Sequence, residues 1–337
     1  MTASSAPSAA SVSAQHTLFP RLLADVGGTN ARFARQAAPG AQLEDIRVLP
    51  GDDFDSLQAA IEAYLESVPV SERPRAAAIA IANPVTGDEV RMTNRDWVFS
   101  QKAMKEALGL KLLRVINDFT ALALALPDLA PDELRQIGGG AARPDAAVAL
   151  VGAGTGLGVS GLVPNGHGGW AALAGEGGHV SLPVETPRER LVADGLVAEY
   201  GHASAERLLS GQGLADACRI LCEADGVKPE QIPASAADVT RLALSGELPQ
   251  AQEALTMFCA LLGSVAANVA LTLGAQGGVY VGGGIVPRLG GWFDRSPFRQ
   301  RFEAKGRFAS YLGQIPVWVI MAKDSPALLG AARSLDH

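Results

Sequence analysis

An amide and a carboxylate, Asn117 and Asp118, stand together at the end of a largely apolar run over 112–117. Such a run is typical of a buried strand, and polar side chains at the tip of a strand often face a bound molecule. A carboxylate in that position is able to act as a general base, and the amide both donates and accepts hydrogen bonds. The alternative is that the pair caps the helix that follows, and the residue types alone leave both interpretations open.

A second polar group is the sequence Glu176-Gly177-Gly178-His179, in which two glycines separate an acid from an imidazole. Because consecutive glycines disfavour a helix, we predict a loop here. A carboxylate and an imidazole suit a ring of vicinal hydroxyls, each of which donates and accepts hydrogen bonds. A zinc site would need further ligands nearby in the sequence, and none is present. Glu206 lies at the start of a predicted helix and by itself indicates no function.

Two glycine turns share one plan of strand, Gly-Thr turn and strand: ADVGGTNARFA at 24–34 and GAGTGLGVSGL at 152–162. Glycine lets consecutive backbone N–H groups converge without a Cβ in the way, which suits a phosphate. The second stretch does not fit the G-x-G-x-x-G pattern of dinucleotide sites, and neither turn continues into the Gly-Lys-Ser/Thr of a Walker A loop. We therefore predict a β-hairpin phosphate clamp in each half of the chain, with both turns directed into a shared cleft.

Asp25 immediately precedes the first turn. A carboxylate beside a phosphate is repelled unless a divalent cation lies between them, so we predict that Asp25 orders Mg²⁺ through water. The alternative is that Asp25 caps the turn through its own backbone. A third glycine cluster, Gly282-Gly283-Gly284, ends a predicted strand. It either relieves crowding at a strand-to-helix turn or offers a flat surface to an adenine and its ribose.

The elements that carry these residues alternate between helices and strands, which indicates an α/β fold. A helix is predicted over 55–68, begun by a capping box of Asp55 and Gln58, and another follows Ser100 and ends at Gly109. Continuous apolar runs predict buried strands over 76–82, 112–117, 146–152, 278–283 and 317–322.

Composition limits the classes of protein to consider. A chain of 337 residues, 48% hydrophobic and 19% charged, suits a globular protein of two domains. The net charge of −7 disfavours nucleic acid or an anionic membrane as a partner. The uncharged stretch 254–273 is long enough to span a membrane, but its polar and small residues favour a buried helix. Three cysteines with no signal peptide indicate reduced thiols in the cytoplasm, and we expect Cys218 and Cys222 to be buried.

Several motifs follow one another in the order found in bacterial glucokinases outside the ROK (repressor, open reading frame, kinase) group. They are ADVGGTNARFA, NPVTGDEVRMTNRDW, INDFTALALA, GAGTGLG, GEGGHVSLP, ERLLSGQGL and VYVGGGIVPRL. Together they cover nearly all of the chain after its Ser/Ala-rich beginning, so the chain resembles this family. ROK proteins carry a cysteine-rich zinc motif, which three scattered cysteines cannot form.

The resemblance implies an actin/hexokinase-like (ribonuclease H-like) fold of two α/β domains with an active-site cleft between them. The expected division is a disordered tail over 1–19, a small domain over 20–128 plus 319–337, and a large domain over 129–318. It also implies ATP-dependent phosphorylation of glucose to glucose 6-phosphate, the entry step of glycolysis, with Mg²⁺ as cofactor. The enzyme is then expected in the cytoplasm as a homodimer, with no nucleic-acid or membrane partner.

The resemblance assigns the residues as well. For the nucleotide site it implies Ala24, Asp25, Val26, Gly27, Gly28 and Thr29, with backbone donors around Thr155. The pattern of glycine turns adds Gly154, Gly156, Gly282 and Gly283 to the expected site. The expected sugar site comprises Asn117, Asp118, Glu176, His179 and Glu206, with Asp118 as the catalytic base that takes the proton of the 6-hydroxyl. Two alternatives stay open: a kinase of another hexose, such as mannose or fructose, and a non-catalytic sugar-responsive regulator or assembly protein on the same fold. The phosphate donor, ATP or polyphosphate, is open too.

Overall fold

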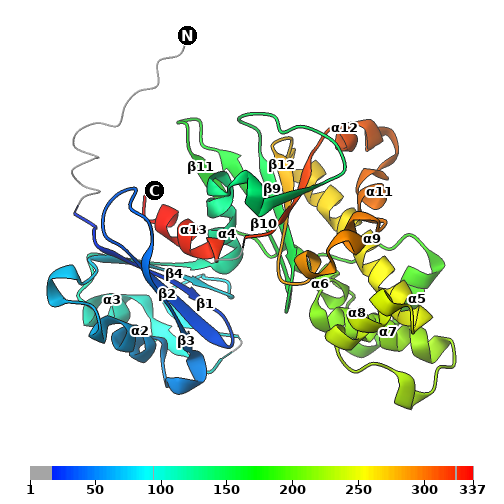
Figure 1. Cartoon of the computed structure of the whole chain (residues 1–337), viewed down its shortest axis with the longest axis horizontal. Helices are drawn as coiled ribbons and strands as arrows, with labels where there is room; N and C mark the ends of the chain where they lie inside the picture. The colour runs from blue at the N-terminus through cyan, green and yellow to red at the C-terminus, as the bar shows by residue number, and fades with distance from the viewer. Residues whose placement is uncertain (1–16, 94, 323–324, 337) are drawn as a thin grey trace, which may run out of the picture. The chain divides into compact units, whose positions relative to one another are not determined.

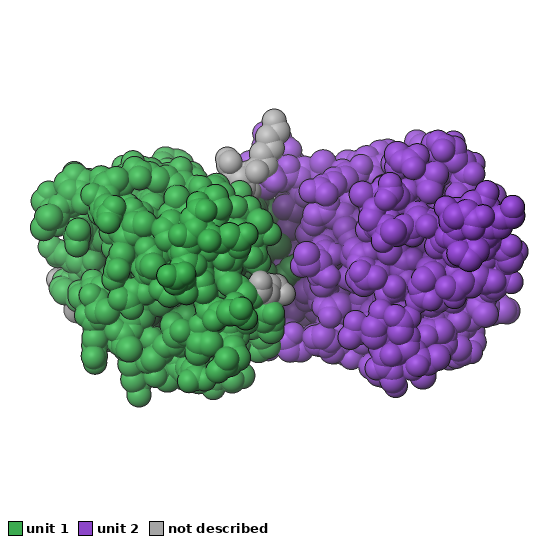
Figure 2. All heavy atoms as spheres, turned by 90° about the horizontal axis from the view of Figure 1, so that it is seen from below, with its two compact units in different colours: residues 1–129, 323–337 green, residues 130–322 purple. Residues whose placement is uncertain are grey.

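The computed structural model describes residues 17–93, 95–322 and 325–336, which form two compact units. Unit 1 comprises the chain up to Leu129 together with the C-terminal segment from position 323, and unit 2 comprises Ala130–Ala322 (Figure 2). The predicted boundary between 318 and 319 falls inside strand β13 (Val317–Ile320). Because β13 pairs with strand β12 (Gly278–Gly282) of unit 2, the division lies after Ala322 instead.

The predicted tail over 1–19 extends too far along the chain. Residues 1–16 lie outside the described residues, but Leu18 packs against an apolar cluster of unit 1 and Phe19 is buried. The guanidinium of Arg21 lies 4.0 Å from the centroid of the Phe19 ring. Apolar side chains packed in this way belong to the folded unit.

Unit 1 contains a five-stranded sheet in the order β3-β2-β1-β4-β7. Its strands are β1 (Arg21–Val26), β2 (Asn30–Gln36), β3 (Glu44–Pro50), β4 (Ala76–Ile81) and β7 (Leu112–Asn117). Strands β1, β2 and β3 are antiparallel neighbours, whereas β1, β4 and β7 run parallel. The carboxyl ends of these last three strands therefore meet at one edge of the sheet.

The helices of unit 1 are α2 (Leu57–Glu66), α3 (Gln101–Ala107), α4 (Asp118–Ala125) and α13 (Pro326–Ser334), and β5 (Glu89–Arg91) pairs with β6 (Val98–Ser100). The two predicted helices are confirmed, and Ser100 caps α3. The predicted capping box at the start of α2 is wrong, because the Ser56 hydroxyl accepts the Ala59 N–H at 3.1 Å. Helix α13 packs against α4 (Figure 1), and Gly330 allows the close approach, since a Cβ there would overlap the Ala121 carbonyl.

Unit 2 contains a six-stranded sheet in the order β11-β10-β9-β12-β13-β8. The strands not yet given are β8 (Leu134–Ile137), β9 (Val148–Ala153), β10 (Leu157–Pro164) and β11 (Trp170–Leu173). The helices are α5 (Pro187–Tyr200), α6 (Ala205–Leu208), α7 (Gly211–Ala224), α8 (Ala236–Ser245), α9 (Pro249–Leu273), α10 (Gly291–Asp294), α11 (Phe298–Glu303) and α12 (Ala309–Gly313). The five strands predicted from apolar runs correspond to β4, β7, β9, β12 and β13, but in β7 only Val115 is buried and the other residues are partly exposed.

Helix α9 contains the uncharged stretch 254–273, which is long enough to span a membrane. In the described part of the chain, 78% of its most apolar window is buried inside the structure. The predicted buried helix is therefore confirmed. Cys259 of α9 and both Cys218 and Cys222 of α7 are buried as well, and burial raises the pKa of the Cys259 thiol to about 12. A thiol with such a pKa stays protonated at neutral pH and is a poor nucleophile.

A buried ion pair joins α5 to α11. The Glu189 carboxylate accepts a hydrogen bond from Arg301 Nη1 at 2.6 Å and from the backbone N–H groups of Glu185 and Thr186. Burial by itself raises the pKa of this carboxyl, but these donors outweigh it and hold the pKa below its ordinary value. The pair therefore favours the charged carboxylate in the folded protein.

The two units repeat one plan (Figure 1). In unit 1 the hairpin β1–β2 has β3 on one side and the parallel strands β4 and β7 on the other. In unit 2 the hairpin β9–β10 has β11 on one side and the parallel strands β12 and β13 on the other, with β8 added at the edge. The repeat of strand, Gly-Thr turn and strand that the sequence predicts is confirmed, and so is the α/β class.

Candidate active site

The turn between β1 and β2 presents unused backbone donors. The Gly27 N–H closes the turn by donating to the Asn30 carbonyl at 3.0 Å. Among the described residues, the N–H groups of Gly28 and Thr29 donate to no acceptor, and Thr29 is exposed. Two successive N–H groups at the tip of a hairpin suit an anion. The side chains of Ala24 and Val26, by contrast, are buried in the core, so these two residues carry the turn but do not present a side chain at its tip.

Asp25 is bound by a residue from the C-terminal segment. Its Oδ2 accepts the Ser325 hydroxyl at 2.5 Å, and Arg32 Nη1 lies 3.9 Å away. Within the described residues no N–H of the turn donates to this carboxylate, so the capping alternative is not what the structure has. The Asp25 side chain is 24% exposed and therefore open to water.

The possible metal ligands around Asp25 suit Mg²⁺ better than a metal ion whose ligands all come from the protein. No group of three or more His, Cys, Asp or Glu side chains suited to a metal occurs among the described residues. Mg²⁺ commonly uses one or two carboxylates and completes its shell with water and phosphate oxygens. One accessible carboxylate beside a turn with unused backbone N–H groups matches that pattern.

Asn117 is the last residue of β7 and caps α4. Its Oδ1 accepts the N–H groups of Phe119 and Thr120 at 2.9 and 3.1 Å, and its Nδ2 donates to the Asn83 carbonyl at 3.4 Å. The capping interpretation therefore holds for Asn117. Asp118 is the first residue of α4, and its Oδ1 accepts the Phe119 N–H at 2.8 Å. The cap fixes the direction of the helix start and thereby the place of the Asp118 carboxylate.

Strand register brings this pair and the first glycine turn to the same row of the sheet. Val26 of β1 pairs with Ile81 of β4, and Ile81 pairs with Asn117 of β7. Neighbouring strands lie about 4.8 Å apart, so the backbones of Val26 and Asn117 are about 10 Å apart. Asp118 and the backbone donors of the turn thus lie at the same edge of one sheet. Transfer of a phosphoryl group needs such an arrangement, with the site of the acceptor hydroxyl next to the site of the phosphate.

The turn between β9 and β10 has the same property. The Gly154 N–H donates to the Gly156 carbonyl at 2.8 Å, while the N–H groups of Thr155 and Gly156 donate to no acceptor among the described residues. The next N–H, that of Leu157, donates to Glu206 Oε2 at 2.8 Å. Unit 2 therefore offers a second pair of successive backbone donors, and Glu206 is bound directly beside it.

Glu176, His179 and Glu206, which the family resemblance groups together, lie close to one another. His179 Nε2 lies 4.0 Å from Glu176 Oε2, and His179 Nδ1 lies 3.9 Å from Glu206 Oε1. The predicted loop contains one 3₁₀ turn over Gly177–His179, and a Cβ on Gly178 would overlap the Leu157 carbonyl. The His179 side chain is 60% exposed, so the imidazole and the two carboxylates are open to a polar ligand.

In the third glycine cluster, steric crowding explains why position 283 is a glycine. This residue has a φ of +83°, and a Cβ there would overlap the Ala153 carbonyl. Gly282 is buried within β12, whereas Gly283 and Gly284 are exposed. A Cβ on Gly154 would lie 3.9 Å from the Gly284 N, so the cluster adjoins the second turn. Of the two residues predicted to face an adenine, only Gly283 is at the surface.

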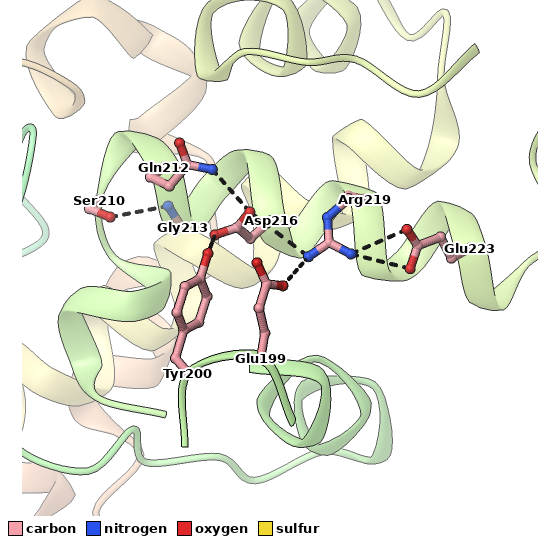
Figure 3. Close-up of polar contacts among 8 residues, drawn as sticks. All are labelled: Glu199, Tyr200, Ser210, Gln212, Gly213, Asp216, Arg219 and Glu223. Carbon is pink, nitrogen blue, oxygen red and sulfur yellow. Dashed lines mark hydrogen bonds and ion pairs between the residues drawn. The ribbon is translucent and has the colours of Figure 1, made fainter. Parts of the chain in front are cut away.

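Helix α7 begins at the second turn and is anchored by side chains. The Gly211 N–H donates to the Gly154 carbonyl at 2.8 Å. Figure 3 shows the anchoring: the buried Asp216 accepts the Tyr200 hydroxyl at 3.1 Å and Gln212 Nε2 at 3.0 Å. In the same view Arg219 bonds to Glu199 of α5. These contacts hold α7 against α5, which fixes the start of α7 beside the turn.

Sequence reasoning missed two residues that contact the first turn or Asp25. Arg95 Nη2 donates to the Gly28 carbonyl at 2.6 Å, although 67 residues separate the two, and Ser325 reaches Asp25 across 300 residues. Arg95 lies within a motif that carries the family resemblance, but nothing in the residue pattern distinguishes it from a surface charge. Contacts of such long range depend on how the chain folds back.

Comparisons with known proteins show the family to which the chain belongs. A sequence profile of glucokinases matches residues 22–337. The glucokinase of Chromobacterium violaceum is 56% identical over 320 residues, which cover 95% of this chain and 90% of the relative. The chain belongs to the glucokinase family. Glucokinase activity, the phosphorylation of glucose by ATP, is the activity that the match supports, and the family and enzyme class predicted from the sequence are confirmed.

Solved structures confirm the fold. The glucokinase of an Antarctic psychrotroph has a TM-score of 0.84 at 38% identity and covers 94% of this chain and 98% of its own. The glucokinase of Balamuthia mandrillaris, solved in complex with glucose, has a TM-score of 0.77 over 94% of this chain and 93% of its own, but at 19% identity it shows the fold alone. The two-domain sugar-kinase architecture expected from the resemblance is thus confirmed.

Proposed function

We propose that Asp118 is the general base of glucose phosphorylation in this protein, and that the first glycine turn binds the phosphates of ATP. The observation that carries this proposal is the common register of Val26, Ile81 and Asn117. It puts the turn and Asp118 at one edge of one sheet. A base and a phosphate site at that edge serve a reaction in which most of the rate gain comes from positioning.

The nucleotide is bound mainly by backbone. Successive backbone N–H groups come from Gly28 and Thr29 in unit 1 and from Thr155 and Gly156 in unit 2. Among the described residues, none of these four N–H groups donates to an acceptor. Asp25 would hold Mg²⁺ through water, and the ion when bound neutralises charge on the phosphates. Gly283 provides side-chain-free surface for the adenine and ribose.

The sugar is bound by Asn117, Asp118, Glu176, His179 and Glu206. Existing contacts limit which atoms take part. Asn117 Oδ1 is occupied by the cap of α4, and one N–H of Nδ2 donates to the Asn83 carbonyl, so the second N–H of Nδ2 is its donor to a hydroxyl. Glu206 Oε2 is occupied by the Leu157 N–H, which leaves Oε1, on the side of His179, to accept.

The state of the enzyme in the cell is inferred from the family resemblance and from the composition of the chain. It is a cytoplasmic homodimer that needs no nucleic acid or membrane. Its net charge of −7 supports the last point, because polyanions would repel it.

The test is a panel of acceptors and donors with the purified full chain. Glucose, mannose and fructose are each offered with ATP, and glucose is offered with polyphosphate, while sugar phosphate is measured. We expect the highest kcat/KM for glucose with ATP. Preference for another hexose would contradict the sugar assignment, and sugar binding without any product would make the chain a non-catalytic regulator.

A further inference from the structure

Arg95 is not among the predicted site residues, and its side chain is nearly buried in unit 1. Its side chain is only 9% exposed, and its guanidinium lies 4.7 Å from the centroid of the Trp97 ring. A Cβ on Gly51 would overlap the guanidinium, so the backbone there is in direct contact with it. An arginine as enclosed as this is rarely found unless its charged group is paired.

Arg95 reaches the carbonyls of the first glycine turn through Nη2, whereas its buried Nε has no hydrogen-bond partner among the described residues. Nη2 lies 2.6 Å from the Gly28 carbonyl oxygen, 3.4 Å from that of Thr29, and 3.1 Å from Asp52 Oδ1. The Gly51 N–H also donates to the Thr29 carbonyl, at 2.9 Å. The carbonyl groups of the turn are thus held on one side by the Arg95 guanidinium and the Gly51 N–H.

This arrangement determines where the N–H groups of the turn point. The Gly28 carbonyl and the Thr29 N–H belong to the same planar trans peptide group and therefore point in opposite directions. Holding the carbonyl against Arg95 aims the Thr29 N–H away from Arg95. A cation on the oxygen side also polarises the peptide group, which strengthens its N–H as a donor.

We propose that Arg95 is a positioning residue for nucleotide binding: it acts through the Gly28–Thr29 peptide group and does not itself contact ATP. This rests on the proposed role of the turn as the phosphate site. A purely structural role, in which Arg95 only joins the turn to the segment around Gly51, is the competing explanation.

The test uses Arg95→Met, which keeps much of the apolar stem against Trp97 and removes the donors. Loss of a hydrogen bond from a charged donor is expected to raise the KM and the Kd for ATP about 10- to 100-fold. The Kd for glucose, measured by calorimetry without nucleotide, is expected to stay within about twofold. Millimolar methylguanidinium added to Arg95→Ala is expected to lower the KM for ATP in a saturable way.

Two variants serve as matched controls. Arg35 is also a nearly buried arginine of unit 1, and its partners Glu44, Asp45 and Glu72 are remote from the turn. Arg35→Met should lower Tm and leave the KM for ATP unchanged. Asp52→Asn should likewise leave that KM unchanged, because Asp52 is 87% exposed and the Gly28 carbonyl still holds Arg95.

The outcomes separate this proposal from the one on which it rests. If Gly28→Val leaves ATP affinity unchanged, the turn is not the phosphate site, and both proposals are overturned. If Gly28→Val weakens ATP binding but Arg95→Met does not, only the positioning role is overturned. It is also overturned if Arg35→Met raises the KM for ATP as much as Arg95→Met does, since general destabilisation then explains both.

Discussion

Gly156 is where one added methyl group should disturb the sugar site without disturbing the fold. A Cβ at this position would lie 2.4 Å from Glu206 Oε2, so the carboxylate must withdraw by about 1 Å to reach an ordinary contact. That movement stretches the 2.8 Å hydrogen bond from the Leu157 N–H. The obstacle is the far end of a flexible side chain, so Gly156→Ala should still fold.

The expected size follows from the role proposed for Glu206. Hydrogen bonds to a charged group contribute about 1.5–3 kcal/mol, which corresponds to about a 10- to 150-fold change in affinity. A misplacement of about 1 Å also costs up to about 10²-fold in turnover. We therefore expect Gly156→Ala to raise the glucose Kd by at least about tenfold and to lower kcat as well.

The assay pairs calorimetry of glucose binding with steady-state kinetics. Gly139→Ala is the matched control, because a Cβ on Gly139, also in unit 2, meets no atom within 4 Å. A folded Gly156→Ala protein that binds glucose as tightly as the Gly139→Ala control would refute the placement of Glu206 in the sugar site. Glu206→Gln, which keeps an acceptor for Leu157, should weaken glucose binding by a smaller factor than Gly156→Ala.

Three further predictions concern single residues. His179→Ala should raise the KM for glucose with the fold intact, since the side chain is largely exposed, and unchanged glucose kinetics would remove His179 from the site. Gly28→Val should weaken ATP binding more than glucose binding in separate titrations, whereas equal losses would indicate misfolding. Glu189 has a lowered pKa in the folded state, so its contribution to stability is present above the ordinary carboxyl pKa and is lost as the pH falls through the lowered value. The Tm of the parent should therefore fall more steeply on acidification than the Tm of Glu189→Gln. At neutral pH the substitution should lower the free energy of unfolding by about 3–5 kcal/mol. Parallel profiles of Tm against pH would contradict this prediction.

Local patterns were enough to predict several of the elements and the two turns. The residue types in apolar runs such as 76–82 and in glycine turns such as 24–34 are enough to predict the local structure. A strand buried on both faces needs apolar residues, and the tip of a tight hairpin needs glycine. The cap by Ser56 in place of Asp55 shows the limit of such patterns, since adjacent polar residues compete for the same N–H groups.

The contacts that assemble the site depend on chain reversal and were not predictable in this way. Glu206 indicated nothing alone, because its partner Leu157 is 49 residues away. The row of Val26, Ile81 and Asn117 exists only once three strands pair in parallel. The family resemblance named most of the proposed site residues, but only the register of the strands explains why Asp118 lies near the turn.

Asp118→Asn tests the central claim most directly. Asparagine keeps the size of the side chain and an oxygen that can still accept the Phe119 N–H, so the start of α4 should be preserved. It removes the base. The measurement is kcat at saturating ATP and glucose, together with the calorimetric Kd for glucose. We predict a fall in kcat of about 10²- to 10⁴-fold with glucose still bound. A variant that binds glucose and turns over near the parent rate would show that Asp118 is not the base.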